Sequence, residues 1–251
     1  IISGWLTCVT LSILFWGFGD WYAILASVSS QEYSRSQVFR YSMSVALPVG
    51  TYGTAFGASG IANGFTVLQT CLLSLLLFSG ASQFAFVGVM GAGGSALSGI
   101  ATGGLLGFRN GLYALRMSQL LQTRGLKKFI AAQLTIDEST GVALAQEERG
   151  EAAMRYGFWA TGIGVYLSWN FFTLLGAYGA QALGNPSAWG LDAAVPAAFL
   201  GLVWPRLIDK RTQMIALLAM VLAVLLVPFV PAGVPIIATV AIALIFGWRS
   251  R

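Results

Sequence analysis

An arginine inside an apolar segment is the residue of this sequence that most clearly points to chemistry. Arg109 lies within residues 96–123, about 22 Å along a helix axis from Arg124 at a rise of about 1.5 Å per residue. A charge at that depth is costly unless it is paired or faces water. Arg109 is therefore a candidate for binding a substrate carboxylate, with a fixed ion pair between helices as the alternative. Tyr113, one turn later on the same helix face, is a second candidate.

Three acidic residues could complement this arginine. Asp137 and Glu138 are adjacent in the centre of residues 129–146, and on a helix they would point about 100° apart, so their spacing does not predict a shared-proton pair. Asp192 follows Asn185-Pro186-Ser187, which is typical of a helix start. All three are candidates for carrying a coupled proton. The alternatives are solvated carboxylates for the pair and an acid stabilised by the helix dipole for Asp192.

Small polar residues interrupt another apolar segment, residues 65–93. The string Ser79-Gly80-Ala81-Ser82-Gln83 predicts two half-helices that meet there. Such a break is tolerated in an apolar setting only where it is buried in protein or lines a cavity. Discontinuous helices of this kind carry the binding sites of many transporters. Ser79, Gly80, Ser82 and Gln83 are therefore candidate substrate-binding residues, and the Gln83 amide can both donate and accept hydrogen bonds.

The composition predicts the class of protein that must position these residues. Apolar residues make up 57% of the 251, charged residues only 9%, and the mean hydropathy is +0.76. Soluble domains carry about 25% charged residues. Apolar segments long enough to cross a bilayer recur at residues 41–60, 65–93, 96–123, 129–146, 156–183, 187–204, 213–230 and 235–248. We therefore expect an all-α, polytopic membrane helix bundle with broken or re-entrant helices.

The basic residues lie in short clusters between these segments, at residues 35–40, 124–128, 147–155, 206–211 and 249–251. If residues 65–93 and 129–146 each enter and leave the membrane by the same face, every cluster falls on the cytoplasmic side. A single kinked span at 65–93 is the alternative. The net charge of +5 then reflects a basic membrane rim rather than a nucleic-acid surface. Residues 5–30 are apolar as well, and they could form a signal-like segment, an extra span or an interfacial helix.

Cysteine and histidine usage argues against several kinds of site. Cys8 and Cys71 lie in apolar surroundings and make neither a disulfide framework nor a metal site. The chain has no histidine, so it lacks the commonest metal ligand and the base of a Ser-His or Cys-His pair. We expect no metal and no cofactor. An enzyme would have to use Asp137, Glu138 or Asp192 with a metal, and we do not expect one.

Glycines recur at a spacing of four residues in residues 96–123. Gly99, Gly103, Gly107 and Gly111 form a smooth stripe that lets another helix approach closely. Gly53 and Gly57 predict the same on a smaller scale. A packing seam is the favoured interpretation, and a glycine-walled substrate path is the alternative.

Four strings follow one another along the chain: Phe78-Ser79-Gly80-Ala81-Ser82-Gln83-Phe84, then Arg109 with Gly111-Leu112-Tyr113-Ala114-Leu115, then Thr135-Ile136-Asp137-Glu138-Ser139, then Leu191-Asp192-Ala193-Ala194-Val195-Pro196-Ala197-Ala198-Phe199. Together they resemble the AzlC family, the large subunits of branched-chain amino acid exporters. The order and spacing agree from about residue 38 to residue 248. Gly107 and Asn110 depart from the pattern, since the family usually has Asn and His at these places.

The resemblance implies a multi-pass protein of a prokaryotic inner membrane that exports valine, leucine, isoleucine or methionine with a small AzlD-type partner subunit. Residues 35–251 would form the transport domain, and residues 1–34 would be an apolar extension. We expect a secondary transporter driven by the proton gradient. An importer, a carrier of another solute and a non-transporting membrane subunit are the alternatives.

Overall fold

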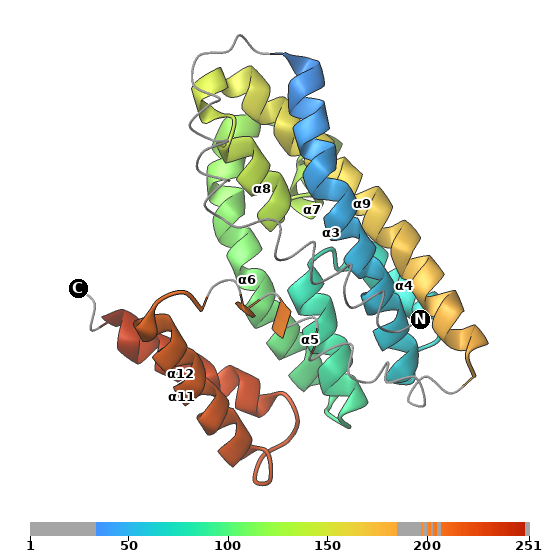
Figure 1. The fold of residues 1–251 in the computed structure, drawn as a ribbon, viewed down its shortest axis with the longest axis vertical. Helices are drawn as coiled ribbons and strands as arrows, with labels where there is room; N and C mark the ends of the chain where they lie inside the picture. The colour runs from blue at the N-terminus through green and yellow to red at the C-terminus, as the bar shows by residue number, and fades with distance from the viewer. Residues whose placement is uncertain (1–33, 185–196, 198–199, 202, 205–206, 249–251) are drawn as a thin grey trace.

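The computed structural model describes residues 34–184, 197, 200, 201, 203, 204 and 207–248, and the elements of these residues are helices (Figure 1). The predicted all-α class is confirmed. Residues 5–30 and most of 187–204 lie outside the described part of the chain. In chain order, the elements are α3 (Arg35–Ala62), α4 (Val67–Leu76), α5 (Gly80–Gly91), α6 (Ala96–Leu121), α7 (Leu126–Gln133), α8 (Asp137–Leu144), η1 (Glu147–Arg149), α9 (Glu151–Ala182), α11 (Lys210–Leu226) and α12 (Val234–Trp248).

Helices α3 and α9 lie side by side and run in the same direction (Figure 1). A methyl group at Gly53 would lie 2.3 Å from the carbonyl oxygen of Trp169, and one at Gly57 would lie 2.1 Å from that of Thr173. On the facing helix, a methyl group at Gly176 would lie 2.1 Å from the Thr54 carbonyl oxygen. Only glycine fits at these positions, so the two backbones touch directly. The close helix packing predicted at Gly53 and Gly57 is confirmed.

The glycine stripe of α6 packs against α5. A methyl group at Gly99 would lie 2.9 Å from the ring of Phe86, and methyl groups at Gly103 and Gly107 would lie 3.2 and 3.1 Å from atoms of Ser82. Position 111 is different, because a methyl group there would meet no described atom within 4 Å. The packing seam is therefore confirmed for three of the four glycines.

Two predicted apolar segments are each divided into two short helices. Residues 65–93 form α4 and α5, of 10 and 12 residues, and residues 129–146 contain parts of α7 and α8, of eight residues each. The predicted break into two half-helices is confirmed, but it lies at residues 77–79, so that Ser79 precedes α5 while Ser82 and Gln83 belong to the helix. Whether either pair re-enters one face of a membrane stays a prediction.

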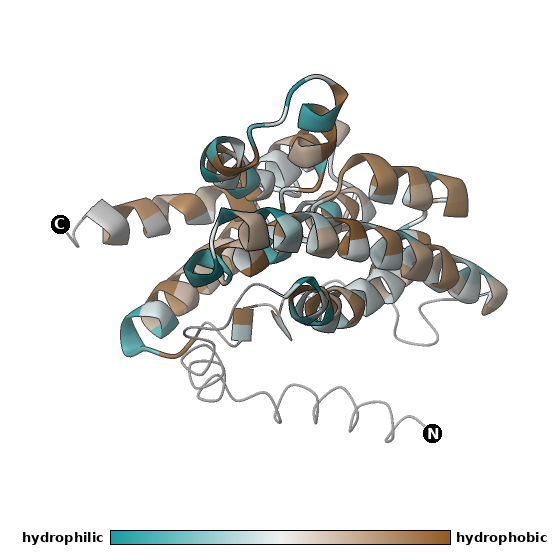
Figure 2. Cartoon of the chain, turned by 90° about the horizontal axis from the view of Figure 1, so that it is seen from above, coloured by the Kyte–Doolittle hydropathy of each residue, from teal (hydrophilic) through white to brown (hydrophobic). Residues whose placement is uncertain are grey.

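The interior combines aromatic and aliphatic side chains with uncharged polar ones. Phe56, Phe84 and Phe158 are among the largest fully buried side chains. The polar residues that are 0% exposed are Ser42, Ser59, Thr70, Ser74, Ser82, Gln83, Thr102, Ser139, Thr161 and Thr173. Large apolar side chains point outward instead, with Leu76, Phe108 and Phe229 at least 68% exposed. Figure 2 shows hydrophobic residues along the outer helices as well as inside.

The prediction of several membrane crossings finds no support in the helices themselves. Within the described residues, no helix combines the length and the hydropathy of a candidate membrane span. The membrane placement of the bundle stays a prediction.

Helices α11 and α12 form a hairpin beside the remaining helices (Figure 1). The turn between them touches the rest of the fold, where Thr102 of α6 donates a hydrogen bond of 3.5 Å to the Gly233 carbonyl. Asp209 precedes α11, and its carboxylate accepts hydrogen bonds from the backbone and the side chain of Thr212. This contact caps the start of α11.

Candidate functional site

A cavity of about 130 Å³ lies where the two helix breaks meet α6. Figure 1 shows α6 passing beside both α5 and α8. Its lining consists of Val49 and Tyr52 from α3; Phe78, Ser79, Gly80, Ala81 and Phe84 around the start of α5; Arg109 and Asn110 from α6; Ile136, Asp137 and Glu138 at the start of α8; and Val165 and Trp169 from α9. Five segments that are distant in sequence therefore form one chamber.

The first break brings Ser79 and Gly80 to this chamber. The backbone of Ser79 is extended, with φ −155° and ψ 103°, so the chain changes direction before α5 begins at Gly80. The Ser82 hydroxyl donates a hydrogen bond of 3.1 Å to the Ser79 hydroxyl. Gly80 and Ala81, in the first turn of α5, also line the cavity. The first N–H groups of a helix have no carbonyl partner within it, so this turn adds hydrogen-bond donors to this part of the fold.

The carbonyl groups left at the end of α4 are bound by side chains from three other elements. The Gln83 amide donates to the carbonyls of Ser74 and Leu77, the Gln133 amide to those of Leu75 and Leu76, and the Tyr166 hydroxyl to that of Leu75. These contacts satisfy polar groups that would otherwise be costly in an apolar setting. Because Gln133 is the last residue of α7, they also join the first broken pair of helices to the second.

The second break places two acidic residues at the start of α8. The backbone of Ile136 is extended, and the Ser139 side chain stabilises this conformation. The Ser139 hydroxyl donates a hydrogen bond of 2.6 Å to the Leu134 carbonyl and accepts one of 3.1 Å from the Ile136 N–H. Asp137 and Glu138 then occupy the first turn of α8, where the helix dipole stabilises negative charge.

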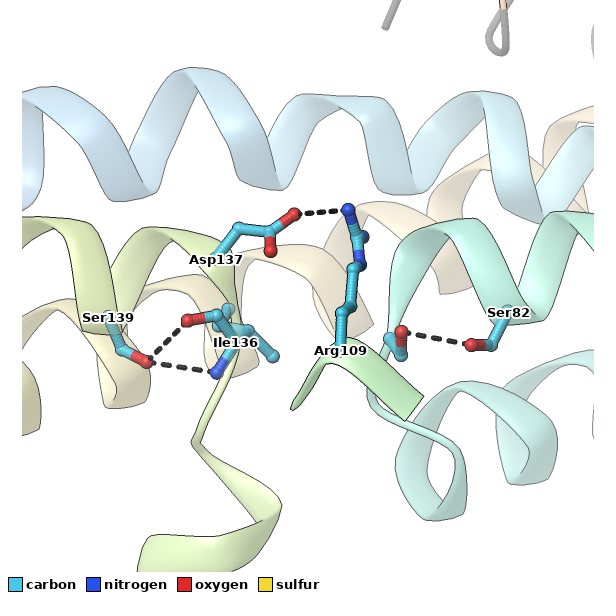
Figure 3. A network of polar contacts seen from close by, with 6 residues as sticks. Ser82, Arg109, Ile136, Asp137 and Ser139 are labelled. Atoms are coloured by element: carbon cyan, nitrogen blue, oxygen red, sulfur yellow. Dashed lines mark hydrogen bonds and ion pairs between the residues drawn. The ribbon is translucent and has the colours of Figure 1, made fainter. Parts of the chain in front are cut away.

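Arg109 and Asp137 form an ion pair across the cavity. The Nη1 atom of Arg109 lies 2.8 Å from Oδ2 of Asp137, and the two side chains are 34% and 27% exposed. Figure 3 shows Arg109 reaching Asp137 on one side, with Ser82 on the other. The pair uses only part of the available hydrogen-bonding groups. Arg109 Nε, Asp137 Oδ1 and Asn110 Oδ1 are buried without a hydrogen-bond partner among the residues that the structure describes.

Phe84 and Trp169 line the apolar side of the cavity, and Phe56 packs behind them. The rings of Phe56 and Phe84 meet edge to face at 5.5 Å, and Trp169 lies 6.4 Å from Phe56 and 6.5 Å from Phe84 between ring centres. The indole N–H of Trp169 donates a hydrogen bond of 3.1 Å to Oε1 of Gln83. The cavity therefore has a charged side formed by α6 and α8 and an apolar side formed by α5 and α9.

The structure brings most of the predicted site residues together. Ser79, Gly80, Arg109, Asp137 and Glu138 all line the cavity. What each of them does there stays a prediction.

The other predicted site residues lie elsewhere. Ser82 and Gln83 are fully buried behind the lining, and the Gln83 amide is engaged by α4 and Trp169 rather than by the cavity. Tyr113 lies one turn further along α6, outside the lining. Asp192 lies outside the described residues.

Sequence reasoning did not assign Asn110 or Trp169 to the site. Asn110 carried a signal, because it is one of the two departures from the family pattern and directly follows Arg109. Trp169 carried none, since it is one of many large side chains in the long helix α9. The described residues contain no group of three or more His, Cys, Asp or Glu side chains placed to hold a metal ion.

No curated protein and no solved structure matches this chain. The family model described as AzlC protein matches residues 44–183, which is more than half of the chain and includes α4 to α8 with both breaks. The chain therefore belongs to the AzlC family, which is associated with branched-chain amino acid transport.

Proposed function

We propose that this protein is a secondary transporter that exports branched-chain and other hydrophobic amino acids, and that the cavity binds the amino acid. One observation carries the proposal. Three unpartnered polar atoms, Arg109 Nε, Asp137 Oδ1 and Asn110 Oδ1, lie in the residues that form the charged side of a cavity whose other side is aromatic.

These atoms are complementary to the two charged groups of an amino acid. Arg109 Nε is a donor, and a guanidinium binds carboxylates through its planar array of N–H groups. Asp137 Oδ1 and Asn110 Oδ1 are acceptors that suit an ammonium group. Because an unpaired buried polar atom costs about 1–3 kcal/mol, a ligand that forms hydrogen bonds with all three atoms is stabilised by contacts that the described residues do not make.

The apolar side suits a small hydrophobic side chain. The whole cavity has a volume of about 130 Å³, close to the roughly 150 Å³ of an engineered cavity that holds benzene. A cavity of this size suits a small amino acid with an apolar side chain, whereas a large polar side chain would be desolvated without partners.

The Arg109–Asp137 pair connects binding to a change of state. A substrate carboxylate competes with Asp137 for the guanidinium, and a substrate ammonium competes with Arg109 for the carboxylate. Bound substrate therefore loosens the contact that holds α6 to the start of α8. Asp137 and Glu138 are the proposed carriers of the coupled proton, and Asp192 stays a candidate. Export and proton coupling rest on the family resemblance.

The membrane placement and the partner subunit are also part of the proposal. Fully buried Ser, Thr and Gln side chains, together with outward-facing Leu and Phe side chains, suit a bundle surrounded by lipid or by another membrane subunit. The apolar residues Phe108, Leu112 and Leu115, which are 53–68% exposed on α6, would contact lipid or a small AzlD-type subunit.

Substrate analogues test the proposal. The full chain, with its partner subunit, is placed in proteoliposomes, and valine counterflow is measured. Isovalerate lacks the amino group of valine and isobutylamine lacks the carboxylate. Each should compete more weakly than leucine by about tenfold or more, because one charged contact is lost. The proposal would be contradicted if either analogue competed as strongly as leucine, or if the protein showed no amino acid counterflow.

A further inference from the structure

The indole ring of Trp169 closes the apolar side of the cavity directly opposite a glycine. Trp169 lines the cavity from α9 and is 6% exposed. Its ring faces Gly80 at the start of α5, where a methyl group would lie 3.1 Å from Cη2, 3.6 Å from Cζ2 and 3.7 Å from Cζ3. A contact of 3.1 Å is tighter than almost all real methyl contacts. The ring and the glycine are therefore in close contact, and together they form one edge of the cavity.

Neighbouring residues hold the Trp169 ring in this position. Its N–H group is bound to Gln83 Oε1, and the Gln83 amide is bound in turn to carbonyls at the end of α4. The rings of Phe56 and Phe84 support Trp169 from the interior, with Phe56 stacked at 28° and Phe84 edge to face at 85°. Phe56 and Phe84 are at most 2% exposed, so they are themselves fixed by packing.

From this geometry, we propose that Trp169 sets the upper size limit of the substrate side chain, with Gly80 beside it at the same edge of the cavity. The inference rests on the proposed function, because it names which hydrophobic amino acids the cavity accepts. Trp169 is a specificity-determining residue in this scheme. Gln83, which was predicted to bind substrate, acts as a positioning residue that holds the indole ring.

Two substitutions should move the size limit in opposite directions. Trp169→Phe removes one ring from the cavity lining and enlarges the cavity. Gly80→Ala adds a methyl group to the lining at the same contact and makes the cavity smaller, and the backbone at residue 80 does not have the positive φ that would strain an alanine. Trp159→Phe is the matched control, because Trp159 is also on α9 and packs on Phe158 but does not line the cavity.

Two ratios of kcat/KM are measured in proteoliposomes with the full chain. The first compares phenylalanine with valine, and the second compares leucine with alanine. A change of one methylene group in an apolar pocket alters such ratios about tenfold or more. We expect Trp169→Phe to raise the phenylalanine-to-valine ratio by about tenfold or more. We expect Gly80→Ala to lower the leucine-to-alanine ratio by a similar factor. Trp159→Phe should leave both ratios within about twofold of the wild type, and the double variant Trp169→Phe/Gly80→Ala should return toward the wild-type values.

The ratio separates size selection from a general loss of activity. A general loss of transport activity lowers the kcat/KM values of all substrates together and leaves their ratios unchanged. Unchanged ratios in Gly80→Ala and in a folded Trp169→Phe, with valine still transported, would overturn the inference and leave the proposed function standing. If Trp169→Phe does not fold, Gly80→Ala alone decides. A wild-type protein that transports no amino acid would instead overturn the proposed function.

Discussion

The contact between helices α3 and α9 differs from the cavity beside it in both charge and packing. Along the pair, Gly53, Gly57 and Gly176 bring two backbones into contact, and no charged residue takes part in this contact. Ser168 adds a hydrogen bond of 3.1 Å from its hydroxyl to the Ala46 carbonyl. In the cavity, Arg109 and Asp137 are charged and keep unpartnered atoms. A closely packed, uncharged scaffold thus supports a site with charged side chains and unpartnered polar atoms.

The largest effect should come from breaking the scaffold. Gly57→Leu would drive a side chain into the Thr173 carbonyl, which is only 2.1 Å from a methyl group at position 57, so α3 and α9 must separate. We expect loss of folded, monodisperse protein in size-exclusion chromatography. Gly111→Leu is the control, since a methyl group there meets no described atom within 4 Å. Equal yields of the two variants would show that the scaffold is not the close packing described.

A smaller effect on stability, with a large effect on transport, is expected in the cavity. Asp137→Asn leaves the guanidinium of Arg109 without its partner. Full burial would make this cost about 3–5 kcal/mol, but the pair is about one-third exposed, so we expect about 1–2 kcal/mol and the loss of valine counterflow.

Thermal unfolding of a double-mutant cycle with Arg109→Gln measures this coupling. Glu147→Gln is the control, because its ion pair with Arg116 is 3.2 Å long and more than half exposed. It should change stability by less than about 0.5 kcal/mol. A Glu147 variant as damaging as the Asp137 variant would remove the distinction between the cavity and the surface.

The smallest effect lies outside both regions, at the start of α11. The side-chain hydrogen bond from Thr212, followed by the backbone N–H of Thr212, holds the pKa of Asp209 below its usual value. A lowered folded-state pKa means that the capping contact stabilises α11 fully above the unfolded-state pKa, near 4, and loses this contribution as the pH falls through the folded-state value.

Backbone hydrogen exchange at Thr212 should therefore become faster at low pH than intrinsic chemistry explains. In Asp209→Ala the same amide should exchange quickly with no such pH dependence. If exchange at the Thr212 amide had the same pH dependence in the two proteins, the Asp209 carboxylate would not be capping α11.

The sequence predicted features that depend on local patterns. The break at Ser79–Gly80 follows from small polar residues in an apolar run, and the packing of Gly99, Gly103 and Gly107 follows from their spacing, so both appear in the structure. Arg109 stood out because a charge is rare in such a segment, and the structure pairs it with Asp137.

Features that depend on how distant segments meet were not predictable in the same way. Trp169 lines the cavity because the close contact of α3 and α9 sets the position of its helix, and nothing next to it in sequence indicates this. Gln83 was expected to contact substrate, yet the break leaves carbonyls at the end of α4 without helix partners, and the Gln83 amide binds two of them. Gly111 fits the glycine pattern but lies beyond the reach of α5.

Valine efflux from proteoliposomes that contain Arg109 variants is the most direct test of the central claim, that Arg109 binds the substrate carboxylate in the cavity. Lysine keeps the charge but loses the planar array of donors, and glutamine loses both. We predict that Arg109→Gln and Arg109→Lys both fold, that Gln abolishes efflux, that Lys retains little, and that Arg116→Gln, which removes an exposed charge of the same helix, transports normally. Near-normal efflux by a correctly folded Arg109→Gln protein would contradict the account.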